Sequence, residues 1–169
     1  MTPRRVFVAG ATGYLGRAAI PLLLGRGHAV RALARPRSLA RVPRGAEAAR
    51  SAGVAHFVYV SVAHPAPPMR AYWEARAEAE VFIAAQGLNA TILRPWYVLG
   101  PGHLWPHLLR PGYWLAERLP ATRATARRLG LVTLSQMAAA IVHAVETPVS
   151  GIRVVEVPEI RTIRLGPAR

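Results

Sequence analysis

Short apolar runs alternate along this chain with longer stretches that carry apolar residues on one face. The short runs are bounded by glycine, proline or polar residues and predict buried strands, whereas the longer stretches predict helices. Alternation of the two types predicts an α/β fold with one parallel sheet of about four strands. The predicted strands cover residues 6–9, 29–34, 56–61, 89–93 and 151–157, and the predicted helices cover 14–24, 47–51, 71–86 and 133–145.

Several helix ends carry sequence signals of their own. Thr133-Leu-Ser-Gln136 has the spacing of a capping box, in which the threonine and glutamine side chains satisfy the first free backbone N–H groups. Gly87 follows a stretch rich in alanine and glutamate and is predicted to end that helix. Pro21 predicts a kink or short break in the first helix. The tail from Arg161 is predicted to be frayed.

Composition excludes several classes of function. The 169 residues suit one domain and include no cysteine, so disulfides, thiol catalysis and thiolate metal sites are absent. No run approaches the roughly 18 apolar residues of a membrane-spanning helix, and no signal peptide is indicated, so we expect a cytoplasmic protein. His103 and His107 are four residues apart, but Pro106 between them disfavours the helix that a shared metal would need, so no metal site is predicted.

The net charge of +14 is carried entirely by arginine against glutamate, because the chain has neither lysine nor aspartate. The arginines are spread along the sequence rather than grouped with aromatic residues. This favours a biased composition over a specific nucleic-acid site, although non-specific attraction to polyanions at low salt is expected.

Three evenly spaced glycines lie between the first predicted strand and the first predicted helix. Such a turn brings backbone N–H groups and the positive end of a helix dipole to a pyrophosphate. The glycines provide positive φ in the turn, room for the phosphate and close contact between strand and helix. The spacing is G-x-x-G-x-x-G rather than G-x-G-x-x-G. The residues predicted to hold the dinucleotide here are Gly10, Thr12, Gly13, Tyr14, Leu15 and Gly16.

A series of motifs in one order resembles the extended and atypical short-chain dehydrogenase/reductases, in particular the NmrA-like NAD(P)-binding proteins. The resemblance covers most of residues 4–157 and implies a Rossmann-like sheet with a small, mostly helical C-terminal cap from residues 96–157. The motifs are Val-Phe-Val-Ala-Gly-Ala-Thr-Gly-Tyr-Leu-Gly-Arg from residue 6, Val-Arg-Ala-Leu-Ala-Arg from 30, Phe-Val-Tyr-Val-Ser from 57, Tyr72 with Arg76-Ala-Glu-Ala-Glu80, Ile92-Leu-Arg-Pro95 and Gly100-Pro-Gly102.

The chain is shorter than this family pattern after its second strand. Only about 20 residues separate Ala34 from Val54, whereas one βαβ unit takes about 30. The resemblance therefore implies that the third and fourth strand units are absent. We expect the strand at 56–61 to move beside the strand at 6–9, into the place of the fourth.

The resemblance also suggests the cofactor. A carboxylate after the second strand would favour NAD, but the first acidic residue is Glu47. Arg35 stands instead at the family position that pairs with a 2′-phosphate, with the planar guanidinium that suits phosphate. NADP(H) is therefore expected in preference to NAD. Arg94 and Pro95 match the loop that passes the nicotinamide end.

The residues at the catalytic positions of the family match the family pattern only in part. Reductases of the family use a tyrosine and a lysine four residues later, with a hydroxyl residue on the preceding strand; this chain has Tyr72, Arg76 and Ser61. An arginine can bind a ribose and favour phenolate, but it does not have the geometry of an ammonium group. The family hydroxyl falls two residues after Ser61, where this chain has Ala63. The Tyr72–Arg76 pair is equally compatible with packing.

Three functions remain open at this point. The first is an NADP(H)-binding sensor or assembly factor with weak or no redox activity. The second is an NADP-dependent oxidoreductase or epimerase/dehydratase-like enzyme that uses Tyr72, and the third is a shortened relative without function. The tryptophan-rich stretch 96–118 is interpreted as part of a cap for an unknown small substrate or as a peripheral membrane contact, and the helix at 71–86 suggests a homodimer by analogy.

Overall fold

The strands of the described chain are all paired in parallel, which confirms the predicted α/β class. The computed structural model describes residues 2–33, 46–48, 55–64, 70–85, 87–101, 110–116 and 118–167. Strands and helices alternate along these residues, and eight strands form three sheets in place of the predicted single sheet of about four.

The N-terminal sheet contains β1 (Arg5–Ala9), β2 (Ala29–Leu33) and β3 (Ala46–Ala48), with β2 in the centre. Helix α1 (Tyr14–Gly25) connects β1 to β2 and keeps Pro21 within its span. The helical piece expected at 47–51 is wrong for its first residues, because β3 pairs with β2 there. Local sequence favours helix at these alanines, but the exposed edge of β2 offers a ladder of hydrogen bonds.

The C-terminal sheet has the order β4 (Phe57–Val60), β5 (Ala90–Arg94), β8 (Ile152–Glu156). The strands β6 (Tyr97–Leu99) and β7 (Leu131–Thr133) form a separate pair that sequence patterning did not predict. The remaining elements are the helices α2 (Arg70–Ala85), α3 (Arg110–Ala116), α4 (Pro120–Arg128), α5 (Leu134–Glu146) and α6 (Val157–Thr162).

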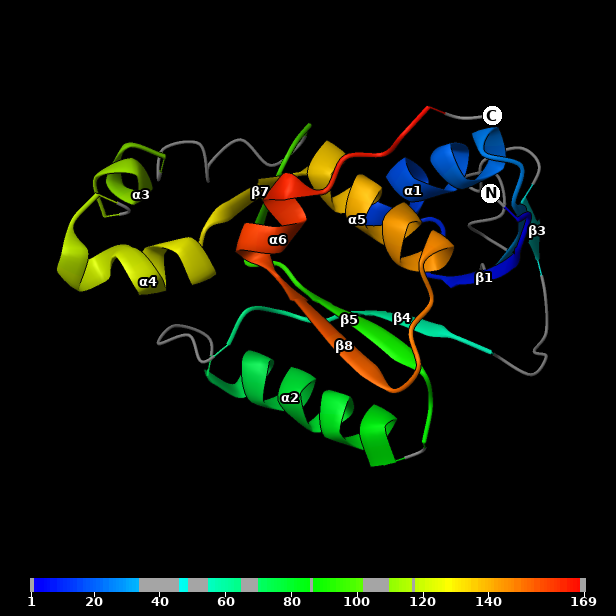
Figure 1. The fold of residues 1–169 in the computed structure, drawn as a ribbon, viewed down its shortest axis with the longest axis horizontal. Coiled ribbons are helices and arrows are strands. Elements are labelled where there is room, and N and C mark those ends of the chain that lie inside the picture. The colour runs from blue at the N-terminus through cyan, green and yellow to red at the C-terminus, as the bar shows by residue number, and fades with distance from the viewer. Residues whose placement is uncertain are drawn as a thin grey trace.

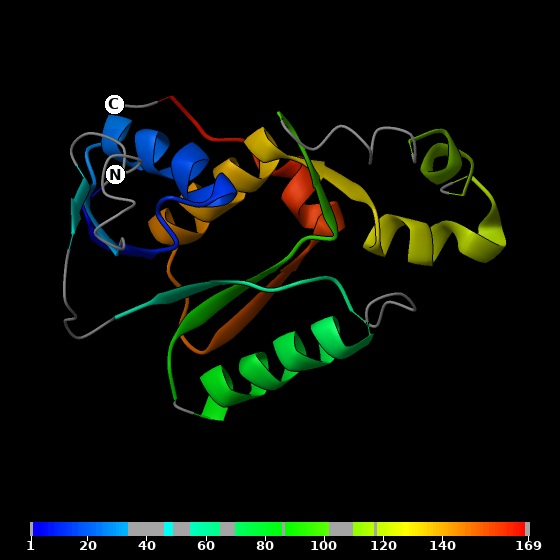
Figure 2. The same ribbon diagram turned by 180° about the vertical axis from the view of Figure 1, so that it is seen from behind.

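Helices cover both faces of the C-terminal sheet. Helix α2 lies on one side of the β4–β5–β8 sheet, while α5 and α6 lie on the other (Figures 1 and 2). Helix α1 packs along α5 at the end of the molecule that holds β1, β2 and β3. Helices α3 and α4 extend from the opposite end, away from the sheets. The molecule is therefore layered only around its C-terminal sheet.

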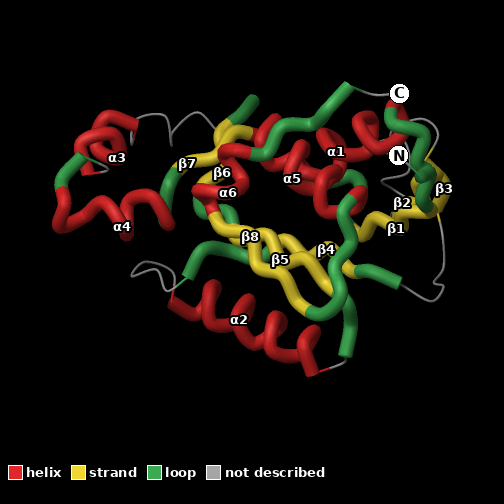
Figure 3. Tube along the Cα trace, viewed as in Figure 1, coloured by secondary structure: helices red, strands yellow, loops and turns green. Residues whose placement is uncertain are grey.

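The expected pairing of the strand at 56–61 with the strand at 6–9 is wrong. Strand β4 pairs with β5 and β1 pairs with β2, and the two sheets share no ladder in the described residues (Figure 3). In a doubly wound sheet of order 3-2-1-4-5-6, the first strand is paired on both edges. Since β3 occupies the third position, the expected absence of a third strand is wrong, and among the described residues no strand occupies the fourth position between β1 and β4.

The N-terminal sheet is also covered on one face only. Val6 and Val8 face the cluster that includes Ile20, Leu23 and Val142, whereas Phe7 on the other face is 44% exposed. The prediction of a buried strand therefore holds for only one face of β1, because among the described residues no helix covers the side of Phe7.

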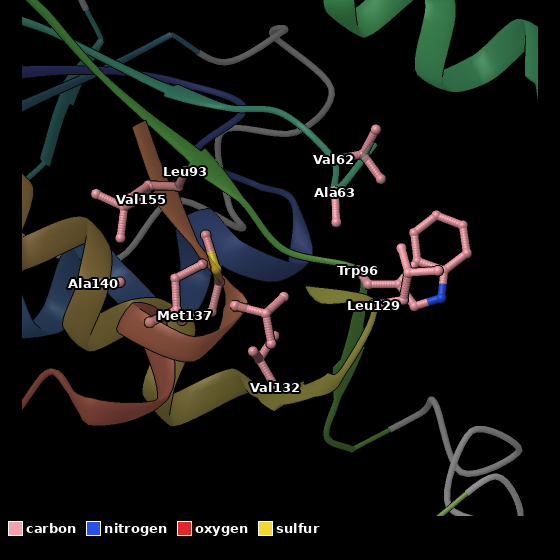
Figure 4. Close-up of a cluster of buried hydrophobic side chains, with 11 residues drawn as sticks. Val62, Ala63, Leu93, Trp96, Leu129, Val132, Met137, Ala140 and Val155 are labelled. Carbon is pink, nitrogen blue, oxygen red and sulfur yellow. The ribbon is translucent and has the colours of Figure 1, made fainter. Parts of the chain in front are cut away.

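The larger core lies between the C-terminal sheet and α5. Val62, Leu93 and Val155 from the sheet side belong to one buried cluster with Met137, which is fully buried (Figure 4). The predicted capping box of α5 is confirmed, with Thr133 and Gln136 hydrogen-bonded reciprocally. The predicted fraying from Arg161 is wrong for the first two residues, because α6 continues to Thr162 and Arg161 Nε donates to the Leu131 carbonyl over 2.9 Å.

Candidate dinucleotide-binding site

The glycine loop has the geometry of an anion-binding turn. Gly10 adopts φ +76°, a conformation that residues with a side chain rarely adopt. The Gly13 amide donates to the Gly10 carbonyl over 2.9 Å, and Gly13 is then the N-cap of α1. No side chain caps this helix, and its first turn contains no acidic residue. As at any helix N-terminus, the first-turn amides of α1 have no carbonyl acceptor one turn earlier in the helix, and Thr12 lies half-buried beside this turn.

Gly16 is required by close contact between the helix and the end of β1. A Cβ atom at this position would stand 2.5 Å from the Gly10 carbonyl oxygen and 2.8 Å from the Ala11 Cα. Both are backbone atoms that cannot rotate away. A Cβ at Gly13 would stand 3.1 Å from the same Gly10 oxygen. The structure thus gives each glycine of the motif a separate steric reason.

A pocket of about 330 Å³ brings the predicted site residues together. Leu15 comes from the glycine loop, Ser61 follows β4, Tyr72 is in the first turn of α2, and Pro95 follows β5. These four positions are distant in sequence and meet at the carboxyl ends of β4 and β5, where ligands bind in open α/β sheets. Val60, Val62, Trp96, Tyr97 and Val98 complete an otherwise apolar lining.

Arg76 sits between two tyrosines on the pocket side of α2. Its guanidinium donates to the Tyr59 hydroxyl over 3.0 Å and to the Tyr72 hydroxyl over 3.5 Å, and it lies over both rings. Tyr72 is 47% exposed. The predicted pair thus forms, but Arg76 is shared with a second phenol.

A buried carboxylate that we did not predict as a site residue lies beneath the pocket. Glu80 of α2 is 7% exposed and accepts hydrogen bonds from Arg94, which reaches both carboxylate oxygens, and from Ser61. Burial alone would raise the pKa of Glu80, but the hydrogen bonds of Arg94 and Ser61 hold it below its usual value. The His64 ring lies 3.4 Å from the same carboxylate and stacks on Trp73. The spacing Tyr72, Arg76, Glu80 places all three on one face of a helix, which is a signal that could have identified Glu80.

Other predicted residues lie elsewhere. Arg35, Gly102, His103 and His107 fall outside the described residues. Gly100 lies against α1, where a Cβ atom would overlap the Tyr14 hydroxyl, so this glycine makes room for that ring. Beside it, a second, mainly apolar pocket of about 530 Å³ lies among Leu22, Leu99 and Leu134.

Two kinds of feature are absent within the described ranges. No group of three or more histidine and acidic side chains lies close enough to hold a metal ion. Among the helices whose positions are described, none combines the length and the apolar character that crossing a bilayer requires. The tryptophan-rich stretch is described only in part, and its Trp114 is exposed with Arg118 over the ring at 3.5 Å.

Known proteins resemble this chain in both sequence and fold. Residues 6–84 match the model of the NAD dependent epimerase/dehydratase family. No curated protein matches the sequence significantly. Among solved structures, the Bordetella bronchiseptica enzyme WbmH in complex with NAD+ has a TM-score of 0.61 at 16% identity, over 92% of this chain and 76% of the enzyme.

Two other solved structures show the same fold. An NAD+-bound xylitol dehydrogenase has a TM-score of 0.57 at 12% identity, over 91% of this chain and 97% of the enzyme. A putative 2-deoxy-d-gluconate 3-dehydrogenase from Agrobacterium tumefaciens, with bound NADP, has a TM-score of 0.50 at 15% identity, over 91% and 95% of the two chains. At these identities the three structures show that the chain shares their Rossmann-like α/β fold.

Proposed function

We propose that this chain binds NADP(H) with little or no redox turnover and acts as a dinucleotide sensor or assembly factor. The observation that carries the proposal is the pocket in which the glycine loop, Ser61, Tyr72 and Pro95 meet. A dinucleotide with its pyrophosphate at the first turn of α1 would direct its nicotinamide into this pocket. The similar structures with bound NAD+ and NADP support a nicotinamide dinucleotide as the ligand.

The preference for NADP(H) rests on the charge that follows β2. The first acidic residue of the chain is Glu47, so no carboxylate directly after β2 is present to bind a ribose 2′-hydroxyl. Arg35 follows within two residues of the end of β2 and supplies a guanidinium for a 2′-phosphate.

Weak or absent turnover follows from the partners of Tyr72 and Ser61. A catalytic tyrosine needs a pKa near the working pH, and its usual lysine is replaced by Arg76, which is shared with Tyr59. The Ser61 hydroxyl is bonded to Glu80. Ala63, at the position where the family carries its hydroxyl residue, is 2% exposed and has no polar group. Neither hydroxyl is therefore poised to polarise a carbonyl.

A second candidate is an oxidoreductase or epimerase-like enzyme that uses Tyr72. The exposure of Tyr72 and its place in the pocket wall favour this candidate. A third candidate, a shortened relative without function, is favoured by the break between β1 and β4.

Titration with NADPH and with NADH separates these candidates. We expect NADPH to bind about tenfold or more tightly than NADH, and we expect Arg35→Glu to abolish that difference. Arg41→Glu is the matched control, because it changes the net charge equally at a position further from β2. Binding of neither nucleotide would leave only the third candidate.

A turnover assay tests the second candidate. NADPH oxidation with test carbonyl substrates that disappears in Tyr72→Phe would establish it.

A further inference from the structure

The Glu80–Arg94 ion pair fixes the protonation state of the group beneath the pocket. Arg94 donates from Nε to both carboxylate oxygens, over 3.1 and 3.2 Å, and from Nη2 to Oε2. A carboxylate held in this way is ionised, and an ionised carboxylate can only accept hydrogen bonds. Whatever hydroxyl lies against Glu80 must therefore donate to it.

Ser61 is that hydroxyl. Its Oγ donates to Glu80 Oε1, and the residue is 5% exposed while lining the pocket. A serine has one proton, so only its oxygen lone pairs remain for a ligand. The Ser61 oxygen is a buried acceptor, so it gains a hydrogen bond only from a ligand group that donates one. A ligand without such a donor leaves this oxygen without a hydrogen bond and binds more weakly.

We propose that Glu80 is a positioning residue that makes Ser61 a hydrogen-bond acceptor, so that the pocket selects a head group with an N–H donor, the carboxamide of nicotinamide. The inference rests on the proposed function, because it requires the nicotinamide end of a dinucleotide in this pocket. It assigns Glu80 and Ser61 the orientation of the carboxamide, with its NH2 toward Ser61.

The test compares NADP+ with its 3-acetylpyridine analogue by calorimetric titration. The analogue keeps the carbonyl acceptor and replaces NH2 by a methyl group of similar size, so it lacks only the donor. We expect the wild-type chain to bind NADP+ about tenfold more tightly than the analogue. In Ser61→Ala this ratio falls to about one, because no acceptor remains to be satisfied.

Glu80→Gln tests the positioning role. A glutamine can itself donate to Ser61, which frees the serine proton for the ketone of the analogue, so the ratio falls several-fold. Glu156→Gln is the matched control: Glu156 also faces Arg94, at 3.6 Å, but is half-exposed, and the ratio stays at the wild-type value.

Equal binding of both ligands by the wild-type chain overturns the inference and leaves the proposed function intact. Binding of neither overturns both. If Glu80→Gln does not fold, Ser61→Ala alone decides, and an unchanged ratio in that variant rejects the role of Ser61.

Discussion

At the scale of single residues, the site depends on positions where a side chain is impossible rather than on reactive groups. Gly16 lets the first turn of α1 lie against the end of β1, and Gly100 makes room for the Tyr14 ring at the same helix end. The close approach at Gly16 brings the N-terminus of α1, the end of a helix that attracts anions, next to the end of β1. The loop is therefore a rigid steric arrangement, and small changes in it are expected to alter ligand binding.

Gly16→Ala tests this arrangement. The new methyl group would collide with the Gly10 carbonyl, so we expect NADPH affinity to fall by about tenfold and the free energy of unfolding by about 1–3 kcal/mol. Gly25→Ala in the same helix is the control, since no atom lies within 4 Å of its Cβ position. Titration and urea unfolding measure the two effects. Equal behaviour of the two variants would contradict the steric account.

At the scale of elements, a buried ion pair joins α1 to α5. Arg26, directly after α1, donates to the Glu146 carboxylate at the end of α5, and both side chains are almost fully buried. His28 lies 3.4 Å from the same carboxylate and accepts the Arg4 amide at Nδ1, over 3.2 Å. Burial alone would raise the pKa of Glu146, but the hydrogen bond and charge of Arg26, with His28, hold it below its usual value.

The free energy of unfolding should therefore depend on pH in the acidic range. A carboxyl whose pKa is lowered on folding stabilises the folded state above its unfolded pKa of about 4.5, and this contribution is lost as the pH falls through the folded value. We expect a steep fall in the free energy of unfolding below about pH 4.5 and a shallower one in Glu146→Gln. Arg26→Ala should cost about 3 kcal/mol at neutral pH, because it leaves a buried charge without its partner. Chemical unfolding at several pH values measures both, and parallel pH profiles would contradict the role of Glu146.

The two sheets should differ in local stability. Strand β5 is paired on both edges and its first four residues are buried, whereas β1 is paired with β2 alone among the described strands. We expect the slowest amide hydrogen exchange in β5 and markedly faster exchange in β1. Exchange in β1 as slow as in β5 would indicate that another segment occupies its second edge.

At the scale of the whole molecule, the sequence predicted the elements better than their assembly. The α2 helix and its Gly87 end were predictable, because alanine and glutamate favour helix and Gly87 adopts φ +66°. The strand β3 was not, because its conformation depends on pairing with β2. The lack of pairing between β1 and β4 was not predictable either, because which strand pairs with which edge depends on the other strands available for pairing.

The same division applies to the site. The glycine loop, Ser61, Tyr72 and Pro95 were predicted individually and meet in one pocket. Glu80 was overlooked, because most glutamates in an alanine- and glutamate-rich helix are exposed to solvent, although its spacing from Tyr72 and Arg76 places it on the same helix face. Only the approach of Arg94 from β5 shows that its carboxylate is buried and paired.

The outer face of α2 suggests a homodimer. Val81 and Phe82 of α2 are 71% and 66% exposed. We expect a dimer by light scattering that Phe82→Glu converts to a monomer, since burying an unpaired charge opposes association. Leu22→Glu, at an exposed apolar position of α1, is the control and should leave the dimer intact. A wild-type monomer would contradict the expectation.

The most direct test of the account is a crystal structure of the chain grown with NADP+. We predict that the pyrophosphate accepts hydrogen bonds from the amides of residues 14–16 and that the nicotinamide occupies the pocket between Leu15, Tyr72 and Pro95. An unoccupied glycine loop at saturating NADP+, or a nucleotide bound elsewhere, would contradict it.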